Sequence, residues 1–356
     1  MFAVRVECRD RDAEFAVFRD EVGCAVDLVS PADDPRVIRV RRGDDAALEL
    51  VRYDIDRPLH LVVAGHDAAR LVSPGGTVVD VEAPPADTAV GAEMTVPDNQ
   101  PSLVVVGGTH GDFGVGRAGM EYRDLLPDRW GGRFIASHIH IGDGGDVADW
   151  VHFHRIRFQM IYVAAGWVDV VYEGQGEPFR MHPGDCVLQP PEIRHRVLRS
   201  SAGLEVIEVG CPAEHDTIAD HGLELPDTEF TPDRDFSGQR FVRHIAADAT
   251  GATWVDPTMV AVATGIADAT NSLAGVATVA ASAANGGGQR LTHDGEFVLL
   301  VGLAGDATLD IAGASTTFGP RSSVAVPPGT RWAWSERSSD HRALVVELPA
   351  NTIRQA

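Results

Sequence analysis

The chain consists largely of short apolar stretches separated by Gly, Pro and Asp. Helical periodicity is nearly absent, whereas alternation of apolar and polar residues recurs along most of the sequence. This pattern predicts an all-β protein of barrels or sandwiches, with one helix at Asp12–Val22. The clearest predicted strands are Val37–Val40, Leu59–Ala64, Phe134–Ile141, Gln159–Ala164, Val168–Tyr172, Val187–Gln189, Leu204–Val209, Phe297–Val301, Ser323–Val326 and Ala343–Leu348.

Two stretches rich in Pro and acidic or small polar residues divide the chain of 356 residues. They are residues 83–101 and 212–236, and both have the composition of surface connections. The sequence therefore predicts a β-rich N-terminal module at 1–95, a central domain at 96–225 and a C-terminal domain at 226–356.

Charge and composition narrow the class of partner. The formal net charge of -22 repels nucleic acid and anionic membranes, so we expect a small-molecule substrate instead. All basic residues are Arg, which excludes Schiff-base chemistry on a lysine. The N-terminus has no apolar signal segment, no apolar run is long enough to cross a membrane, and the four cysteines lack disulfide or zinc spacing. These features predict a cytoplasmic protein.

The candidate chemistry lies near the middle of the chain. Residues 149–166 read DWVHFHRIRFQMIYVAAG, and the two-residue spacing of His152 and His154 places both side chains on one face of a strand. Gln159 follows five residues later, and His195 comes after a Pro-Pro turn.

This arrangement resembles the cupin superfamily. The family's first motif is His-x-His, a Glu five residues on and a Gly seven further; its second is Gly-Asp, then a Pro six residues after the Gly and a His five after the Pro. The matching residues are His152, His154, Gln159 and Gly166 in the first motif and Gly184, Asp185, Pro190 and His195 in the second. The resemblance covers about residues 115–212 and implies a metal-binding cupin barrel whose ligands are His152, His154 and His195, with Gln159 as a fourth.

Two departures from the family pattern alter the expected site. Gln159 replaces the carboxylate ligand, and Glu192 replaces a Gly on the barrel rim. Three neutral imidazoles and a neutral amide leave a dication uncompensated, which favours an anionic substrate and one transition metal ion: Fe, Ni, Cu, Zn or Mn. Alternatively, the Gln159 amide acts outside the ligand set, as a hydrogen-bond partner of a bound water or ligand.

Strand alternation extends the prediction to the cavity wall. If Gln159 faces inward, Ile161 and Val163 do so too, and Arg157 lies near the mouth. We assign Gln189 to the pocket as a polar group that orients substrate or satisfies a buried backbone group. His138, from a second His-x-His with His140, is assigned to the pocket or the surface but not to a second metal site, because no Glu or Gln follows at the required spacing.

The C-terminal domain repeats the motifs in degenerate form. His293 is retained, but Leu291, Val298 and Trp332 occupy the other ligand positions. We therefore predict a second cupin barrel without a metal and read Glu296 as a solvated charge. The N-terminal module shows no ligand pattern and is interpreted as structural, extending the first barrel.

The outer face of one strand needs a covering partner. Phe158, Met160 and Tyr162 alternate with the inward set, and each buried apolar side chain is worth roughly 1.5–3 kcal/mol. We expect the second barrel to cover this face, with a homodimer or the N-terminal module as alternatives.

The sequence leaves several functions open and identifies no catalytic residue. The nitrogen-rich ligand set and the apolar cavity favour a metal-dependent oxygenase, of the dioxygenase type, acting on a small anionic substrate. A metal-dependent isomerase or lyase and a non-catalytic small-ligand binder are the alternatives.

Overall fold

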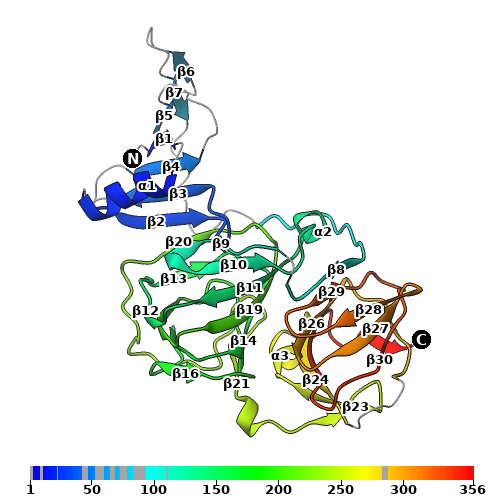
Figure 1. Ribbon diagram of the computed structural model, residues 1–356. Helices are drawn as coiled ribbons and strands as arrows, with labels where there is room; N and C mark the ends of the chain where they lie inside the picture. Colours follow the sequence, from blue (N-terminus) through cyan, green and yellow to red (C-terminus); the bar gives the residue numbers. More distant parts are fainter. Residues whose placement is uncertain are drawn as a thin grey trace.

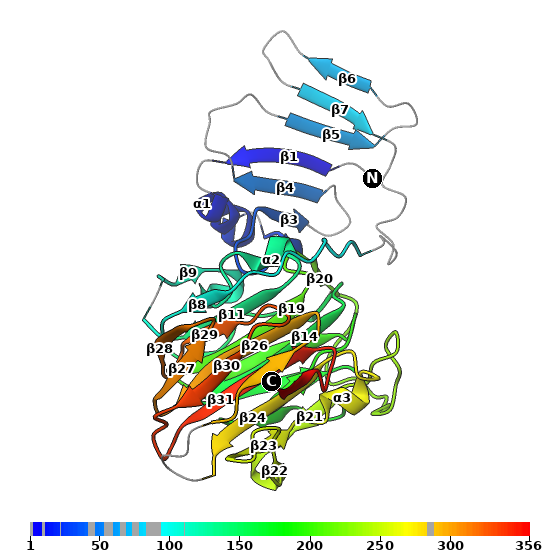
Figure 2. The ribbon, with the colours of Figure 1, turned by 90° about the vertical axis from the view of Figure 1, so that its right-hand side faces the viewer.

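The computed structural model contains three β-rich parts that follow one another along the chain (Figures 1 and 2). It describes residues 3–8, 11–21, 23–41, 47–52, 60–64, 69–72, 78–82, 94–109, 111–282 and 288–356. Each strand predicted from the sequence overlaps an observed strand. Among the described residues, no helix is long and apolar enough to cross a membrane.

The N-terminal module is a sheet that stands above the first barrel in Figure 1. Its sheet order is β2-β3-β4-β1-β5-β7-β6. The predicted helix is present as α1 (Arg11–Ala16) followed by the π-helical turn η1 (Val17–Glu21), and Val22 lies outside the described residues. The strands are β1 (Ala3–Cys8), β2 (Ala25–Ser30), β3 (Val37–Arg41), β4 (Ala47–Arg52), β5 (His60–Ala64), β6 (Ala69–Val72) and β7 (Val78–Glu82).

The first barrel consists of two sheets. One has the order β21-β17-β14-β19-β11-β10-β9; the other, β16-β15-β18-β13-β20, continues into β2 of the N-terminal module. The strands are β9 (Gly114–Val115), β10 (Glu121–Asp124), β11 (Ile135–Ile141), β12 (Gly145–Asp146, beside β18), β13 (His152–His154), β14 (Phe158–Ala165), β15 (Val168–Tyr172), β16 (Phe179–Met181), β17 (Cys186–Leu188), β18 (His195–Ser200), β19 (Leu204–Cys211), β20 (Thr217–Ala219) and β21 (Val242–His244).

The stretch 212–236, predicted as a surface connection, is in part structural. It contains β20, which pairs with β13 on one side and β2 on the other, and Thr217 within it is fully buried. β20 has only three residues, which is too short for an alternating pattern to be recognised among the surrounding prolines and acidic residues, so the sequence did not predict this strand.

The second barrel repeats the two-sheet plan, with the orders β22-β23-β24-β31-β26-β29-β8 and β28-β27-β30-β25-β32. Segments outside the two barrels add a strand to each. β8, which precedes the first barrel along the chain, pairs with β29 of the second barrel. β21, which lies between the barrels along the chain, pairs with β17 of the first barrel. The bounds are β8 (Val104–Val106), β22 (Ala252–Thr253), β23 (Met259–Ala263), β24 (Gly275–Ala281), β25 (Leu291–His293), β26 (Phe297–Ala304), β27 (Ala307–Ile311), β28 (Ala314–Phe318), β29 (Ser323–Ala325), β30 (Trp332–Ser335), β31 (Arg342–Leu348) and β32 (Ile353–Gln355). The short helices are α2 (Arg129–Gly132) and α3 (Ile266–Ala269), with 3-10 turns η2 (Arg117–Gly119) and η3 (Ala246–Asp248).

The two barrels share one apolar core, which confirms that the second barrel covers the outer face of β14. Phe158, Met160 and Tyr162 are buried in a cluster with residues of β26 and β31. Phe297 of β26 also stacks on Phe134, with ring centroids 4.1 Å apart. A face of this composition is too costly to leave in water, and the second barrel buries it within the same chain.

Glu296 is not a solvated charge, as the sequence predicted. It is partly buried between the barrels, where Arg133 donates to it at 2.5 Å and Arg157 at 3.0 Å. These ion pairs join the second barrel to the first at the edge of the shared core. The prediction failed because both partners lie far from Glu296 in the sequence.

Candidate metal centre

Three histidines meet inside the first barrel. His152 lies directly opposite His195 across the β13–β18 ladder, and His154 points the same way two residues along β13. The ring centroids of His152 and His195 are 4.2 Å apart, and those of His154 lie 5.1 and 5.2 Å from the other two. The possible ligand atoms of all three side chains lie within 4.8 Å of one another, and all three side chains are buried. This cluster could hold one metal ion.

Hydrogen bonds on the outer ring nitrogen orient each imidazole. The carbonyl of Trp150 accepts from Nδ1 of His152 at 2.7 Å, and the carbonyl of Ile193 accepts from Nδ1 of His195 at 3.0 Å. Nδ1 of His154 lies 3.1 Å from the hydroxyl of Thr217. A carbonyl can only accept, so Nε2 of His152 and of His195 keeps a free lone pair, as metal binding requires.

The environment keeps the three imidazoles neutral. Burial lowers the pKa of His195 from 6.5 to about 4. Burial, reinforced by Arg117 for His152 and by His195 for His154, holds the pKa of these two side chains well below the usual value. Neutral imidazole is the form that binds a metal, so the site needs no deprotonation step at neutral pH.

The atoms around the cluster fit an ion. Nε2 of His152 and Oε1 of Gln159 are both buried and have no hydrogen-bond partner among the described residues. A buried polar atom left without a partner costs about 1–3 kcal/mol, and a cation held by these acceptors would remove that cost. The amide nitrogen of Gln159 donates to Glu208, which leaves the amide oxygen as the atom it can offer. Its place in the ligand set stays a prediction.

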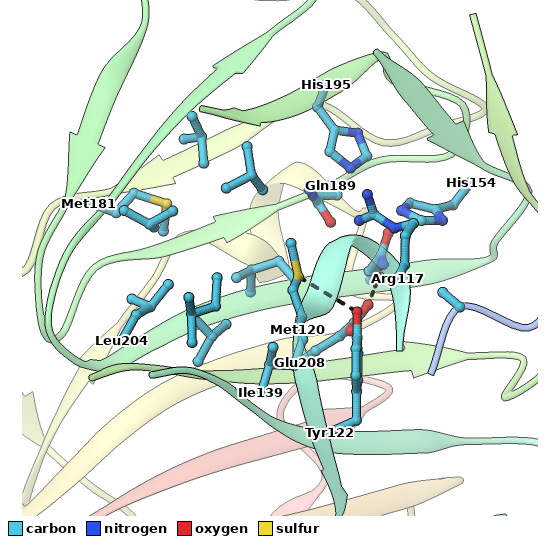
Figure 3. Close-up of a pocket in the computed structure, with 18 of the residues that line it drawn as sticks. Arg117, Met120, Tyr122, Ile139, His154, Met181, Gln189, His195, Leu204 and Glu208 are labelled. Carbon is cyan, nitrogen blue, oxygen red and sulfur yellow. Dashed lines mark hydrogen bonds between the residues drawn. The ribbon is translucent and has the colours of Figure 1, made fainter. Parts of the chain in front are cut away.

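A cavity of about 80 Å³ adjoins the cluster (Figure 3). His154, His195, Gln159 and Gln189 line its polar end, together with Arg117 and Glu208. The remaining wall is mainly apolar and includes Met120, Ile139, Ile161, Met181 and Leu204. Gln189 donates to the hydroxyl of Tyr172 at 2.8 Å, and that ring stacks on His195 with centroids 5.4 Å apart.

Three residues assigned to the pocket from the sequence lie elsewhere. Arg157 precedes β14, so strand alternation does not apply to it, and it pairs with Glu296 between the barrels. Val163 faces the barrel interior and packs in the same apolar cluster as Met120 and Leu204, but it does not line the cavity. His138 alternates with the cavity residue Ile139 and therefore faces out of the barrel, where it lies 3.1 Å from Glu205.

Sequence reasoning missed several residues beside the histidines. Arg117 and Asp149 form a buried ion pair, and a carboxylate oxygen of Asp149 lies 3.7 Å from Nδ1 of His152. The other oxygen accepts from the backbone nitrogen of Val197 at 2.9 Å. Glu208, partly buried, also lies in the cavity wall, and desolvation raises the pKa of its carboxyl. Of these three residues, only Glu208 could have been found from the sequence, because it lies on the same strand face as Leu204 and Val206. Arg117 and Asp149 lie on connections, where alternation gives no prediction.

The replacement at Glu192 has a visible consequence. Its φ of 63° lies in the left-handed region, which favours the glycine that the family has at this position. The backbone nitrogen of Glu192 donates to the carbonyl of His154 at 3.0 Å, which ties the turn before His195 to the strand that carries the other two histidines. The turn therefore keeps its shape despite about 1 kcal/mol of strain.

The second barrel does not repeat the cluster. Nε2 of His293 donates to the carbonyl of Val326 at 2.7 Å, and Leu291, Val298 and Trp332 are buried in an apolar core. Within the described ranges, the His152–His154–His195 group is the one candidate metal cluster.

No family model matches the sequence, and no curated protein matches it. Solved structures do match. Protein Ylba from E. coli superposes with a TM-score of 0.53 at 10% identity, over 74% of this chain and 96% of that one. The oxalate decarboxylase of Lactobacillus farciminis, in a formate complex, gives 0.51 at 12% identity, over 74% and 89%. A salicylate 1,2-dioxygenase variant from Pseudoaminobacter salicylatoxidans, in complex with gentisate, gives 0.50 at 15%, over 71% and 83%.

Two barrels of the same plan, the motif spacing and these superpositions agree. The chain has the bicupin fold. At such low identity the likeness concerns the fold alone, so the function of the protein has to be argued from its first barrel.

Proposed function

We propose that this bicupin is a metal-dependent oxygenase that acts on a small anionic organic substrate in its first barrel. The observation that carries the proposal is the convergence of three neutral imidazoles beside a buried arginine and an apolar cavity. When bound, a redox-active transition ion would supply the one-electron chemistry through which dioxygen reacts with an organic substrate.

The charges around the cluster favour an anion. Asp149 compensates Arg117, and the raised pKa of Glu208 favours its neutral form, so a dication on three neutral imidazoles has little nearby negative charge. Arg117 lines the cavity with its side chain 9% exposed, and a guanidinium in such a place binds carboxylates well. Two of the similar proteins are named for small carboxylic acids, oxalate and salicylate, and we extend this class to the present site.

The cavity residues would orient the substrate and exclude water. The hydroxyl of Tyr172 accepts from Gln189, so its own proton is free to be donated to an acceptor in the cavity. The apolar wall of Met120, Ile139 and Ile161 would hold the hydrocarbon part of the substrate.

A metal-dependent isomerase or lyase is the second candidate, and Glu208 favours it. A partly buried carboxyl with a raised pKa in the cavity wall has the properties of a general acid or base. In that reaction Glu208 would move a proton on and off the substrate while the metal stabilised negative charge on it.

Metal analysis combined with oxygen uptake tests the proposal. Protein purified without chelator is analysed for metals, then loaded with Fe, Ni or Cu and screened for oxygen consumption with small carboxylates, using His152→Ala as the control. Oxygen uptake that the control lacks supports the oxygenase. Bound Zn or Mn without oxygen uptake favours the isomerase or lyase, and a protein without metal favours a small-ligand binder.

A further inference from the structure

The N-terminal module reaches the metal cavity. The segment between β2 and β3, residues 31–36, lies against the first barrel, and Ala32 within it lines the same cavity as His154, Gln159 and Arg117. In Figure 3 a blue ribbon from this module enters beside Arg117. The carbonyl of Ala32 accepts from the backbone nitrogen of Arg117 at 3.3 Å. Part of the cavity wall therefore comes from outside the barrel.

The approach of this segment is close. A Cβ added at Gly116 would lie 3.0 Å from the carbonyl oxygen of Ala32 and 2.6 Å from the ring of Tyr122. Distances this short are at or below the shortest that a Cβ atom makes to other heavy atoms. The segment can therefore pack against the barrel connection at Gly116 only because this residue has no side chain.

Anchors on both sides hold the segment in place. Before it, β2 pairs with β20, where Val29 lies opposite Thr217, the residue whose hydroxyl contacts His154. Within it, Asp33 accepts from Arg129 at 2.6 Å, and Arg36 forms an ion pair with Glu214. The β2–β20 pairing thereby connects the module, through β20, to β13, the strand that carries His152 and His154.

We propose that residues 31–36 are a wall of the substrate cavity and that Ala32 limits the size of the carboxylate that the site accepts. This inference rests on the proposed function for the chemistry of the ligand. A cavity of about 80 Å³ has room for a few water molecules, at roughly 10–15 Å³ each, and so for a short carboxylate whose apolar end lies in the barrel. A larger side chain at Ala32, beside Arg117, would reduce this small volume and leave less room for a larger anion.

The test compares a short and a longer anion on the metal-loaded protein. Azide and butanoate are titrated into the full-length protein loaded with Co(II), and binding is followed by the visible spectrum. Ala32→Leu should weaken butanoate binding by at least about tenfold and leave azide within about twofold, because only the longer ligand needs the space that leucine fills. Ala25→Leu, at an exposed position of β2, is the matched control and should change neither. Equal effects on both anions, or none on either, would overturn the assignment of Ala32.

A second measurement separates this inference from the proposed function. If the wild type binds neither anion, the anionic-substrate proposal fails, and the wall is tested by the rate at which dipicolinate removes Co(II). Removing both ion pairs with Asp33→Asn and Arg36→Gln should then speed removal at least about fivefold, since the wall shields the ion from a planar chelator. Asp146→Asn, which breaks the exposed pair with Arg199, is the control. Equal rates in the double variant and the control would show that residues 31–36 do not close the cavity.

Discussion

The buried histidines predict a specific loss of stability when the metal-free protein is acidified. The pKa of His195 falls from 6.5 in the unfolded chain to about 4 in the fold because burial disfavours its charged form. Between these two values the unfolded chain binds a proton that the native state does not. The free energy of unfolding is therefore fully present above pH 6.5 and decreases as the pH falls to about 4.

The expected size follows from the shift. At 1.36 kcal/mol per pKa unit, the change from 6.5 to about 4 amounts to about 3 kcal/mol for His195 alone. His152 and His154, whose pKa values burial lowers as well, add to the loss in the same direction. Acidification to pH 4 should therefore remove a large part of the stability that a domain of this kind has.

Urea unfolding of chelator-treated protein at several pH values between 7 and 4 measures this loss. His195→Asn cannot be protonated in this range, so its stability should change by about 3 kcal/mol less than that of the wild type. His182→Asn replaces a histidine whose side chain is 63% exposed and should behave like the wild type. If His195→Asn and the wild type lose the same stability over this interval, His195 is not buried as described.

Three further predictions concern the core and the site. Met160→Ala, in the core that both barrels share, should lower the free energy of unfolding by about 2–5 kcal/mol in denaturant titrations. Leu103→Ala, at a position 40% exposed, is the control and should change it by less than about 0.5 kcal/mol. Equal small losses in both variants would mean that the barrels do not share this core. Gln159→Glu restores the family carboxylate and should tighten divalent metal binding while weakening azide binding in calorimetric titrations; no change in either would place Gln159 away from the ion. Asp149→Asn leaves Arg117 uncompensated beside His152 and should weaken metal binding by about 10–100-fold in competition with a chelator, and an unchanged affinity would show that this pair does not support the ligands.

The sequence predicts the metal cluster from two sources: local alternation gives His152 and His154, and the resemblance to the cupin motifs gives His195. Alternation with a period of two places His152 and His154 on one face of a strand, whatever the rest of the fold does. The same argument gives the apolar outer face of β14 and its need for a partner. The predicted inward orientation of Arg157 was wrong because Arg157 precedes β14, and alternation determines side-chain direction only within a strand.

The residues that complete the site escape prediction because tertiary contacts place them. Arg117 and Asp149 lie on connections and meet only when the barrel closes. The pairing of Val29 with Thr217 joins strands far apart in the sequence, and the residue pattern of neither strand predicts which strand it pairs with. The contribution of Ala32 to the cavity is likewise invisible in a sequence where alanine is common.

Metal stoichiometry tests the central claim most directly. Protein purified without chelator and analysed by inductively coupled plasma mass spectrometry should contain one equivalent of a transition metal per chain. His293→Ala should retain that equivalent, because His293 is hydrogen-bonded to a backbone carbonyl in an apolar core, whereas the double variant His152→Ala/His195→Ala should lose it. Two equivalents per chain, or metal retained in the double variant, would contradict a single metal centre in the first barrel.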